Sequence, residues 1–163
     1  MTFPRQIVIM GVMGSGKTTI GRALADLLGC RFIDADDLHS AANVAKLSAG
    51  IPLSAEDRSP WIDSVAALIR DLDGRGETAV IACSALTQTI RARLASASQH
   101  LVFVHLRADA IAIGARLEAR KGHFADPSLL ASQYATLEVP ANAISIDASG
   151  SPDQIVRAIA ASL

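Results

Sequence analysis

Short apolar runs alternate along the chain with segments whose apolar residues recur at helical spacing. Gln6 to Met10 is apolar without alternation, as expected for a strand that is buried on both faces of a parallel sheet. Five such runs predict strands, at 6–10, 31–34, 78–82, 101–106 and 143–147. Strands that alternate with helices indicate an α/β fold with a parallel sheet.

Helical periodicity fills the intervals between these strands. Ile20, Leu24, Leu27 and Leu28 share one predicted helix face, and Gly29 is typical of a helix end. Further helices are predicted over 41–49, around 61–72, over 86–95, from 109 toward 120, over 128–137 and from 152 to the end of the chain.

The start of the helix around 61–72 has two interpretations. Ser54 and Asp57 have the spacing of a capping box, which would place Pro60 inside the helix. Alternatively, Ser59 is the N-cap and Pro60 occupies the first helical position, where proline is well tolerated.

Composition narrows the class of protein. The chain has 163 residues, 50% of them hydrophobic and 19% charged, with a net charge of -1. This is typical of one globular domain over 1–163, and near-neutrality argues against a nucleic-acid-binding surface. Cys30 and Cys83 lack metal-site spacing and are expected to be reduced thiols. Gly11 and Gly14 interrupt the first apolar run, so we expect no membrane span and a cytoplasmic protein.

The loop after the first strand carries the strongest chemical signal. Its sequence fits the phosphate-binding pattern G-x-x-x-x-G-K-[ST] between a buried strand and a helix. Small residues let backbone N–H groups approach a triphosphate, and the helix N-terminus adds partial positive charge. Lys17 is expected to reach the β- and γ-phosphates of ATP, and Thr18 to bind Mg²⁺. The predicted nucleotide-binding residues here are Gly11, Val12, Met13, Gly14, Ser15, Gly16, Lys17, Thr18 and Thr19.

A GTPase-like switch is the first alternative for such a loop. The stretch from Asp71 to Gly74 matches D-x-x-G, but it ends an amphipathic helix and is therefore interpreted as a surface turn. The chain contains no N-K-x-D stretch for guanine. The sequence therefore favours a phosphotransferase over a switch.

Acidic residues follow the second strand, at the sheet edge where ligands of α/β proteins bind. Asp36 is the candidate to orient the attacking hydroxyl and accept its proton. Asp34 is the candidate to hold Mg²⁺, either directly or through water. The alternative is that Asp34, Asp36 and Asp37 cap the next helix.

Two arginines one helical turn apart, Arg116 and Arg120, precede a predicted mobile lid around 120–127. Arg120 is the candidate to neutralise charge on the transferred phosphoryl group, with Arg116 nearer the base or the α-phosphate. A closing lid would also exclude water as a competing acceptor. The alternative is a solvated basic helix face.

These segments together resemble the bacterial gluconokinases, ATP-dependent enzymes that make 6-phosphogluconate, within the shikimate-kinase-like group of P-loop kinases. The P-loop is widely shared among kinases. The D-x-D-x-L-H, D-R-x-P-W and R-K-G-H-F motifs, at 34–39, 57–61 and 120–124, are far more specific. The matching stretches are 10–18, Asp34 to His39 with Asn43 and Lys46, 50–53, 57–61, 83–86, 120–124, and 132–134 with Leu137 and Glu138.

The resemblance implies a three-layer α/β sandwich with five parallel strands in the order 2-3-1-4-5, as in P-loop NTPases and nucleoside-monophosphate kinases. It also implies a homodimer and D-gluconate as the acceptor. The substrate contacts that it implies are Asp36, His39, Arg58, Lys121, His123 and Gln133. One departure is that Thr87 and Gln88 stand where the family often has basic residues.

Two other functions compete with this one. Shikimate kinase shares the P-loop and the D-x-D, but Cys83-Ser84-Ala85 stands here where that family has three glycines. A non-catalytic nucleotide-binding regulator is the third reading. Such a protein would not need Asp36 and Arg120 near the γ-phosphate.

Overall fold

A five-stranded parallel sheet lies at the centre of the protein. The computed structural model describes residues 3–119 and 127–163. The strand order is β2-β3-β1-β4-β5 with every pair parallel, which confirms the predicted fold class. The strands are β1 (Gln6–Met10), β2 (Arg31–Asp34), β3 (Ala79–Ala82), β4 (Leu101–Arg107) and β5 (Ile144–Asp147).

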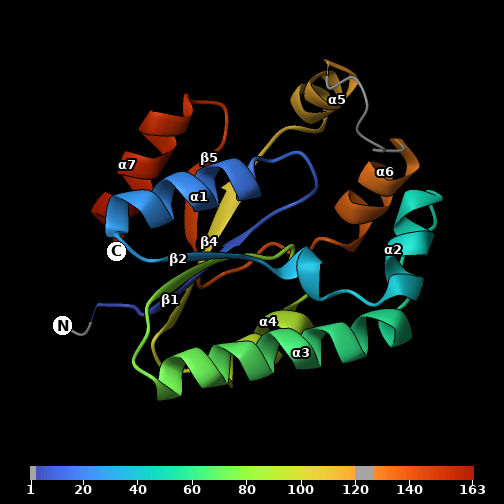
Figure 1. Ribbon diagram of the computed structural model, residues 1–163. Coiled ribbons are helices and arrows are strands. Elements are labelled where there is room, and N and C mark those ends of the chain that lie inside the picture. Colours follow the sequence, from blue (N-terminus) through green and yellow to red (C-terminus); the bar gives the residue numbers. More distant parts are fainter. Residues whose placement is uncertain (1–2, 120–126) are drawn as a thin grey trace.

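Helices cover both faces of this sheet, giving three layers (Figure 1). The elements described are α1 (Lys17–Leu28), the 3₁₀ turn η1 (Ala35–Leu38), α2 (Ala41–Ser48), α3 (Ala55–Gly74), α4 (Gln88–Ala95), α5 (Ala110–Ala119), α6 (Pro127–Thr136) and α7 (Pro152–Ser162). Helices α1 and α7 lie together on one face, and α3 and α4 on the other. Helices α2, α5 and α6 stand beyond the carboxyl edge of the sheet (Figure 1). No helix in the described ranges is long and apolar enough to cross a membrane.

The central position of β1 in the sheet explains why its sequence is apolar without alternation. Val8 and Met10 pack with α3 and α4, whereas Ile7 and Ile9 pack with α1 and α7. All four side chains are fully buried. Burying a side chain of this size stabilises the fold by about 1.5–3 kcal/mol, so both faces of the central strand contribute to the core.

The first helix starts and stops where the glycines predict. Gly16 at its N-cap and Gly29 at its C-cap both have left-handed backbone conformations, and the Gly29 N–H bonds back to the last turn. Leu24 is buried as predicted, but Leu27 is 58% exposed. The buried stripe of α1 is therefore narrower than the apolar pattern indicates.

Helix α3 begins with the capping box, so the alternative that Ser59 is the N-cap is wrong. The Ser54 hydroxyl accepts from the Asp57 N–H, and the Asp57 carboxylate accepts from the Ser54 N–H. Pro60 lies in the second turn, on the exposed side. The carbonyl of Glu56, which loses its helical donor there, belongs to an exposed residue that water can reach. The capping box thus outweighs the lost hydrogen bond.

Candidate active site

The loop between β1 and α1 forms a cradle for an anion. Gly11 has φ +151°, and a Cβ there would lie 2.8 Å from the Ser15 Oγ, so only glycine fits without displacing neighbours. Gly16 caps α1 without a side-chain hydrogen bond, which leaves the first N–H groups of the helix available. The Ser15 hydroxyl is buried and has no partner among the described residues. Free donors at a helix N-terminus are suited to a phosphate group.

Lys17 extends over this cradle from the first turn of α1. Its Nζ donates to the Val12 carbonyl at 2.9 Å. Burial lowers the pKa of Lys17, while the nearby carboxylates of Asp36 and Asp34 act in the opposite direction. A bound phosphate would give the ammonium a stronger, charged acceptor than the Val12 carbonyl.

Thr18 and Asp34 bring a hydroxyl and a carboxylate together beside the cradle. The Thr18 Oγ1 donates to Asp34 Oδ2 at 3.3 Å, and Asp34 Oδ1 accepts from the Asp36 N–H at 3.0 Å. Within the described ranges, no three His, Cys, Asp or Glu side chains form a closed metal site. One carboxylate and one hydroxyl fit Mg²⁺, which usually keeps several waters and binds substrate phosphates as well. Asp34 also caps η1, so the capping alternative holds for Asp34.

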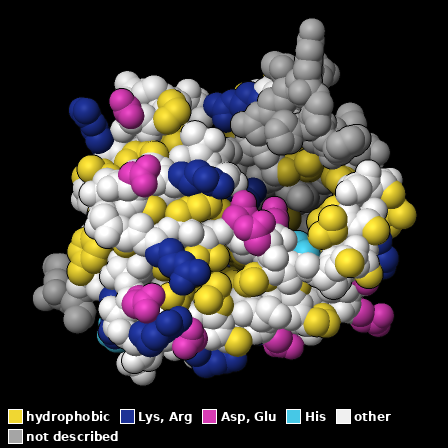
Figure 2. Space-filling model, in the orientation of Figure 1, with side chains coloured by type: hydrophobic (Ala, Val, Ile, Leu, Met, Phe, Trp, Pro, Cys, Tyr) yellow, Lys and Arg dark blue, Asp and Glu magenta, His cyan; other side chains and the backbone are white. Residues whose placement is uncertain are grey.

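A cleft of about 420 Å³ opens from the cradle toward α2, α3 and α6. Its lining includes Thr18, Thr19 and four residues predicted to contact the substrate. Those four are Asp36, His39, Arg58 and Gln133. Figure 2 shows acidic side chains and one histidine gathered near the middle of this face of the molecule. The structure therefore brings phosphate-binding and acceptor-binding groups into one space.

Asp36 stands in this cleft on the turn η1. Its side chain is 73% exposed to solvent, and the protein atoms on its buried side remove part of its hydration. This partial desolvation, followed by repulsion from Asp34, raises the pKa of Asp36, whereas Lys17 and His39 lower it. A carboxylate that is accessible and more basic than usual is suited to accept a proton from a hydroxyl.

The other cleft residues are held by neighbouring backbone and ring contacts. His39 stacks on Trp61 with ring centroids 4.2 Å apart, and burial lowers the pKa of its imidazole. The Arg58 guanidinium donates to the Leu53 carbonyl at 2.7 Å. Gln133 Oε1 accepts from the Met13 N–H at 2.6 Å, which joins α6 to the phosphate loop. These contacts fix the groups before any ligand binds.

Arg116 lies at a second cavity, between the start of α5 and the end of β5. It donates to the Ala148 carbonyl at 2.9 Å, beside Asp109 and Ser149. Asp109 caps α5 by accepting from the Ile111 N–H at 2.7 Å. Arg120, Lys121, His123 and the rest of the predicted lid, up to residue 126, lie outside the described residues, and α6 begins at Pro127.

Sequence reasoning missed two parts of the cleft wall. Trp61 has the helical spacing of a core residue, yet it also lines the cleft and donates from Nε1 to the Ala35 carbonyl at 2.7 Å. Cys83 and Ser84 line the cleft after β3. Burial raises the pKa of the Cys83 thiol to about 12, so it forms a neutral wall. The sequence placed Cys83 and Ser84 at a strand end and Trp61 in the 57–61 motif. Neither position shows where a side chain points.

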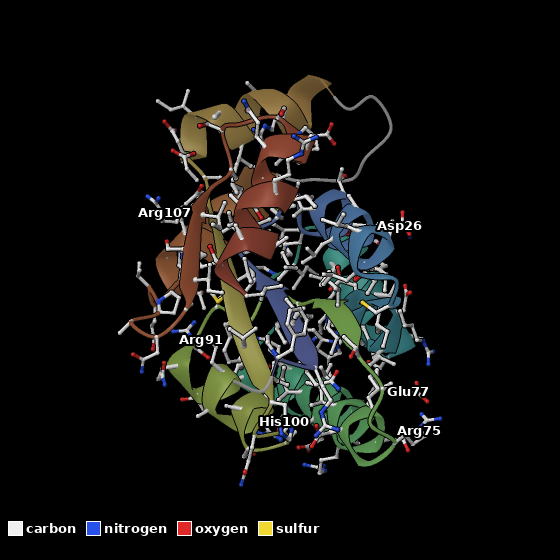
Figure 3. The ribbon with its side chains drawn as sticks, turned by 90° about the vertical axis from the view of Figure 1, so that its left-hand side faces the viewer. Asp26, Arg75, Glu77, Arg91, His100 and Arg107 are labelled. Carbon is white, nitrogen blue, oxygen red and sulfur yellow. The ribbon has the colours of Figure 1, made fainter. Side chains whose placement is uncertain are left out.

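Arg91 supports the turn that carries Ser84. Arg91 lies in the first turn of α4 (Figure 3) and is only 4% exposed. It donates to the Ala85 carbonyl at 2.8 Å and to the Glu138 carbonyl at 2.7 Å. Ala85 has φ +44°, an unfavourable backbone conformation for a residue with a Cβ. Thr87 caps α4 and the Gln88 N–H bonds to the Glu138 carboxylate, so both serve the same junction. The segment 87–91 therefore helps to hold the turn at Ala85.

Replacing Arg91 with methionine is expected to destabilise the protein by about 2–4 kcal/mol, because the buried Ala85 carbonyl and the partly buried Glu138 carbonyl would lose their donors. Arg93→Met on the same helix is the matched control. Arg93 pairs with Asp63 at the surface, where a pair contributes about 1 kcal/mol or less. Urea unfolding of both variants measures the difference, and equal losses would show that the buried contacts of Arg91 are not stabilising.

Comparison with known proteins identifies a family and several relatives to which this chain is similar. A family model described as shikimate kinase matches residues 13–163. The thermosensitive gluconokinase of Escherichia coli (strain K12) is 47% identical over 133 residues, covering 82% of this chain and 71% of that protein. A probable gluconokinase of Dictyostelium discoideum is 43% identical, covering 94% and 83%. The crystal structure of a gluconokinase from Sinorhizobium meliloti 1021 has a TM-score of 0.89 at 37% identity, covering 99% and 92%.

Proposed function

The chain belongs to the gluconokinases of the shikimate-kinase family, and on that premise we propose that it transfers the γ-phosphoryl group of ATP to a hydroxyl of D-gluconate. The products are ADP and 6-phospho-D-gluconate. One structural observation supports this proposal. The anion cradle at Lys17 and the basic carboxylate of Asp36 line the same cleft.

In the proposed reaction, Asp36 accepts the proton of the terminal hydroxyl of gluconate. The hydroxyl oxygen then forms a bond to the γ-phosphorus while the bond to the β,γ-bridging oxygen breaks and ADP leaves. Lys17 and the N–H groups of the loop 11–16 stabilise the charge that develops on the phosphoryl oxygens. The raised pKa of Asp36 supports this role, because a stronger base takes the proton more readily.

Thr18 and Asp34 would hold Mg²⁺, which when bound neutralises negative charge on the phosphates. Arg116 lies at the second cavity and is proposed to contact the nucleotide near its base or α-phosphate. Arg120 is proposed to act on the transferred group, as part of a lid around 120–127 that excludes water.

The acceptor side of the cleft suits a polyhydroxy acid. Arg58 lies there and, with Lys121, is proposed to pair with the gluconate carboxylate. His39, Gln133 and Asp36 are proposed to satisfy hydroxyls, together with His123. We also propose that the protein works in the cytoplasm, as its N-terminal sequence indicates, and that it forms a homodimer, as the family resemblance implies.

The proposal is tested by measuring ADP release with Mg²⁺-ATP and a panel of D-gluconate, other aldonates, shikimate and buffer alone. We expect strong turnover with gluconate only. Turnover with shikimate in place of gluconate would keep the phosphotransferase but contradict the acceptor. Nucleotide binding without turnover of any acid would favour the regulator.

A further inference from the structure

A buried asparagine connects the acceptor side of the cleft to the junction of α2 and α3. Asn43, in the first turn of α2, is only 4% exposed. Its Nδ2 lies 2.9 Å from the Asp57 carbonyl oxygen and 3.2 Å from the Nδ1 of His39.

The chemistry of these two contacts determines where the His39 proton resides. A carbonyl oxygen can only accept, so the amide atom that faces Asp57 must be the NH₂ group of Asn43. That group has two protons to donate and accepts none, so it donates to Nδ1 of His39 as well. A neutral imidazole that accepts at Nδ1 carries its proton on Nε2.

Nε2 is the ring atom on the side of Asp36. It lies 3.8 Å from Asp36 Oδ1, which is too far for a direct hydrogen bond. The two groups are nevertheless close enough to contact the same hydroxyl of a bound acceptor molecule. Trp61 stacks on the imidazole at an interplanar angle of 18° and is anchored by its own bond to Ala35. The ring plane is therefore held, and burial, which lowers the pKa of His39, favours the neutral form.

We propose that Asn43 is a positioning residue that holds His39 as the Nε2–H tautomer. His39 then donates a hydrogen bond from Nε2 in the cleft and has no free ring nitrogen there to take the proton of the acceptor hydroxyl. That proton passes to Asp36 instead. The identity of the acceptor rests on the proposed function, whereas the tautomer rests only on the contacts of Asn43.

The tautomer is measured directly by long-range ¹H–¹⁵N correlation NMR on the full chain labelled with ¹⁵N-histidine. The chain has four histidines, and the His39 signals are identified by their loss in His39→Gln. We expect a protonated Nε2 and an unprotonated Nδ1 at pH 8. A protonated Nδ1, or signals averaged between the two tautomers, would overturn the proposal, and only the assignment variant His39→Gln has to fold for this result.

Asn43→Asp tests the cause, because it is nearly isosteric and replaces the donor at Nδ1 with an acceptor. We expect Nδ1 of His39 to become protonated. We also expect the KM for gluconate to rise roughly 5–20-fold, the loss typical of one misdirected hydrogen bond, while the KM for ATP stays within about twofold.

Lys46→Met is the matched control. The Lys46 Nζ bonds both carboxylate oxygens of Asp57, at 2.8 and 2.9 Å, so its loss loosens the same junction without touching His39. We expect a lower Tm and an unchanged Nε2–H tautomer. If Lys46→Met moved the proton as Asn43→Asp does, general packing and not Asn43 would set the tautomer.

The two proposals fail in different ways. An Nε2–H tautomer in a protein that does not phosphorylate gluconate would contradict only the proposed function. Normal gluconate turnover with a protonated Nδ1 would contradict only the role of Asn43.

Discussion

Replacing Lys17 with alanine is expected to lower kcat by on the order of 10²–10⁴, since preorganised positive charge on the transferred phosphoryl group contributes that much to such reactions. The ammonium of Lys17 stands over the cradle, and among the described residues its hydrogen-bond partner is the Val12 carbonyl. Its loss removes a charge that no other described side chain on the loop supplies. Steady-state ADP release at saturating gluconate measures the effect.

Lys46→Ala is the control for the loss of a lysine. Lys46 pairs with Asp57 and does not line the cleft, so Lys46→Ala is expected to keep kcat within about threefold. Equal losses in the two variants would mean that charge or stability, and not the position of Lys17, governs turnover. Thermal unfolding of both variants separates these explanations.

Replacing Asp36 with asparagine is expected to lower kcat by roughly 10²–10⁴, with little change in ATP affinity, because the amide cannot accept the hydroxyl proton. The change is isosteric, so the cleft keeps its shape. Asp37→Asn is the matched control, since Asp37 is the adjacent exposed carboxylate and does not line the cleft. Full kcat in Asp36→Asn would show that the proton goes elsewhere.

The pH dependence gives an independent measure of the same group. Asp36 works only when ionised, and its pKa is raised. Activity is therefore expected to fall with decreasing pH at a value above that of an ordinary aspartate. The profile of kcat/KM against pH measures this limb. A limb at the ordinary value would contradict the combined effect of the cleft walls and Asp34.

Most elements of the fold were predictable because they depend on local pattern. A strand buried on both faces is apolar without alternation, which is why the run from Ile7 to Met10 in β1 stands out. Glycine in left-handed conformations marks both ends of α1. The start of α3 remained open because two local signals conflict at Pro60. Their relative strength depends on whether water reaches the carbonyl that the proline leaves free.

The candidate site likewise contains residues that the local sequence predicts and residues that it does not. The phosphate loop is contiguous, so the spacing of its glycines and Lys17 predicts its form and its ligand. Asp36 was predicted because the carboxyl end of a parallel strand faces the ligand edge. Trp61 was interpreted only as a core residue, because helical spacing gives the face of a helix but not what the neighbouring elements leave uncovered.

By itself, the sequence determined the strands and helices, the phosphate loop and the acidic turn, and it indicated the family through motifs that run along most of the chain. Only the tertiary structure decided that Arg91 holds the turn at Ala85, that Trp61 supports His39, and that Asn43 faces both His39 and Asp57. The physical reason is that these roles depend on directional contacts across the fold. Arg91 bonds a carbonyl 47 residues away in the chain, and such a pairing leaves no periodic trace in sequence.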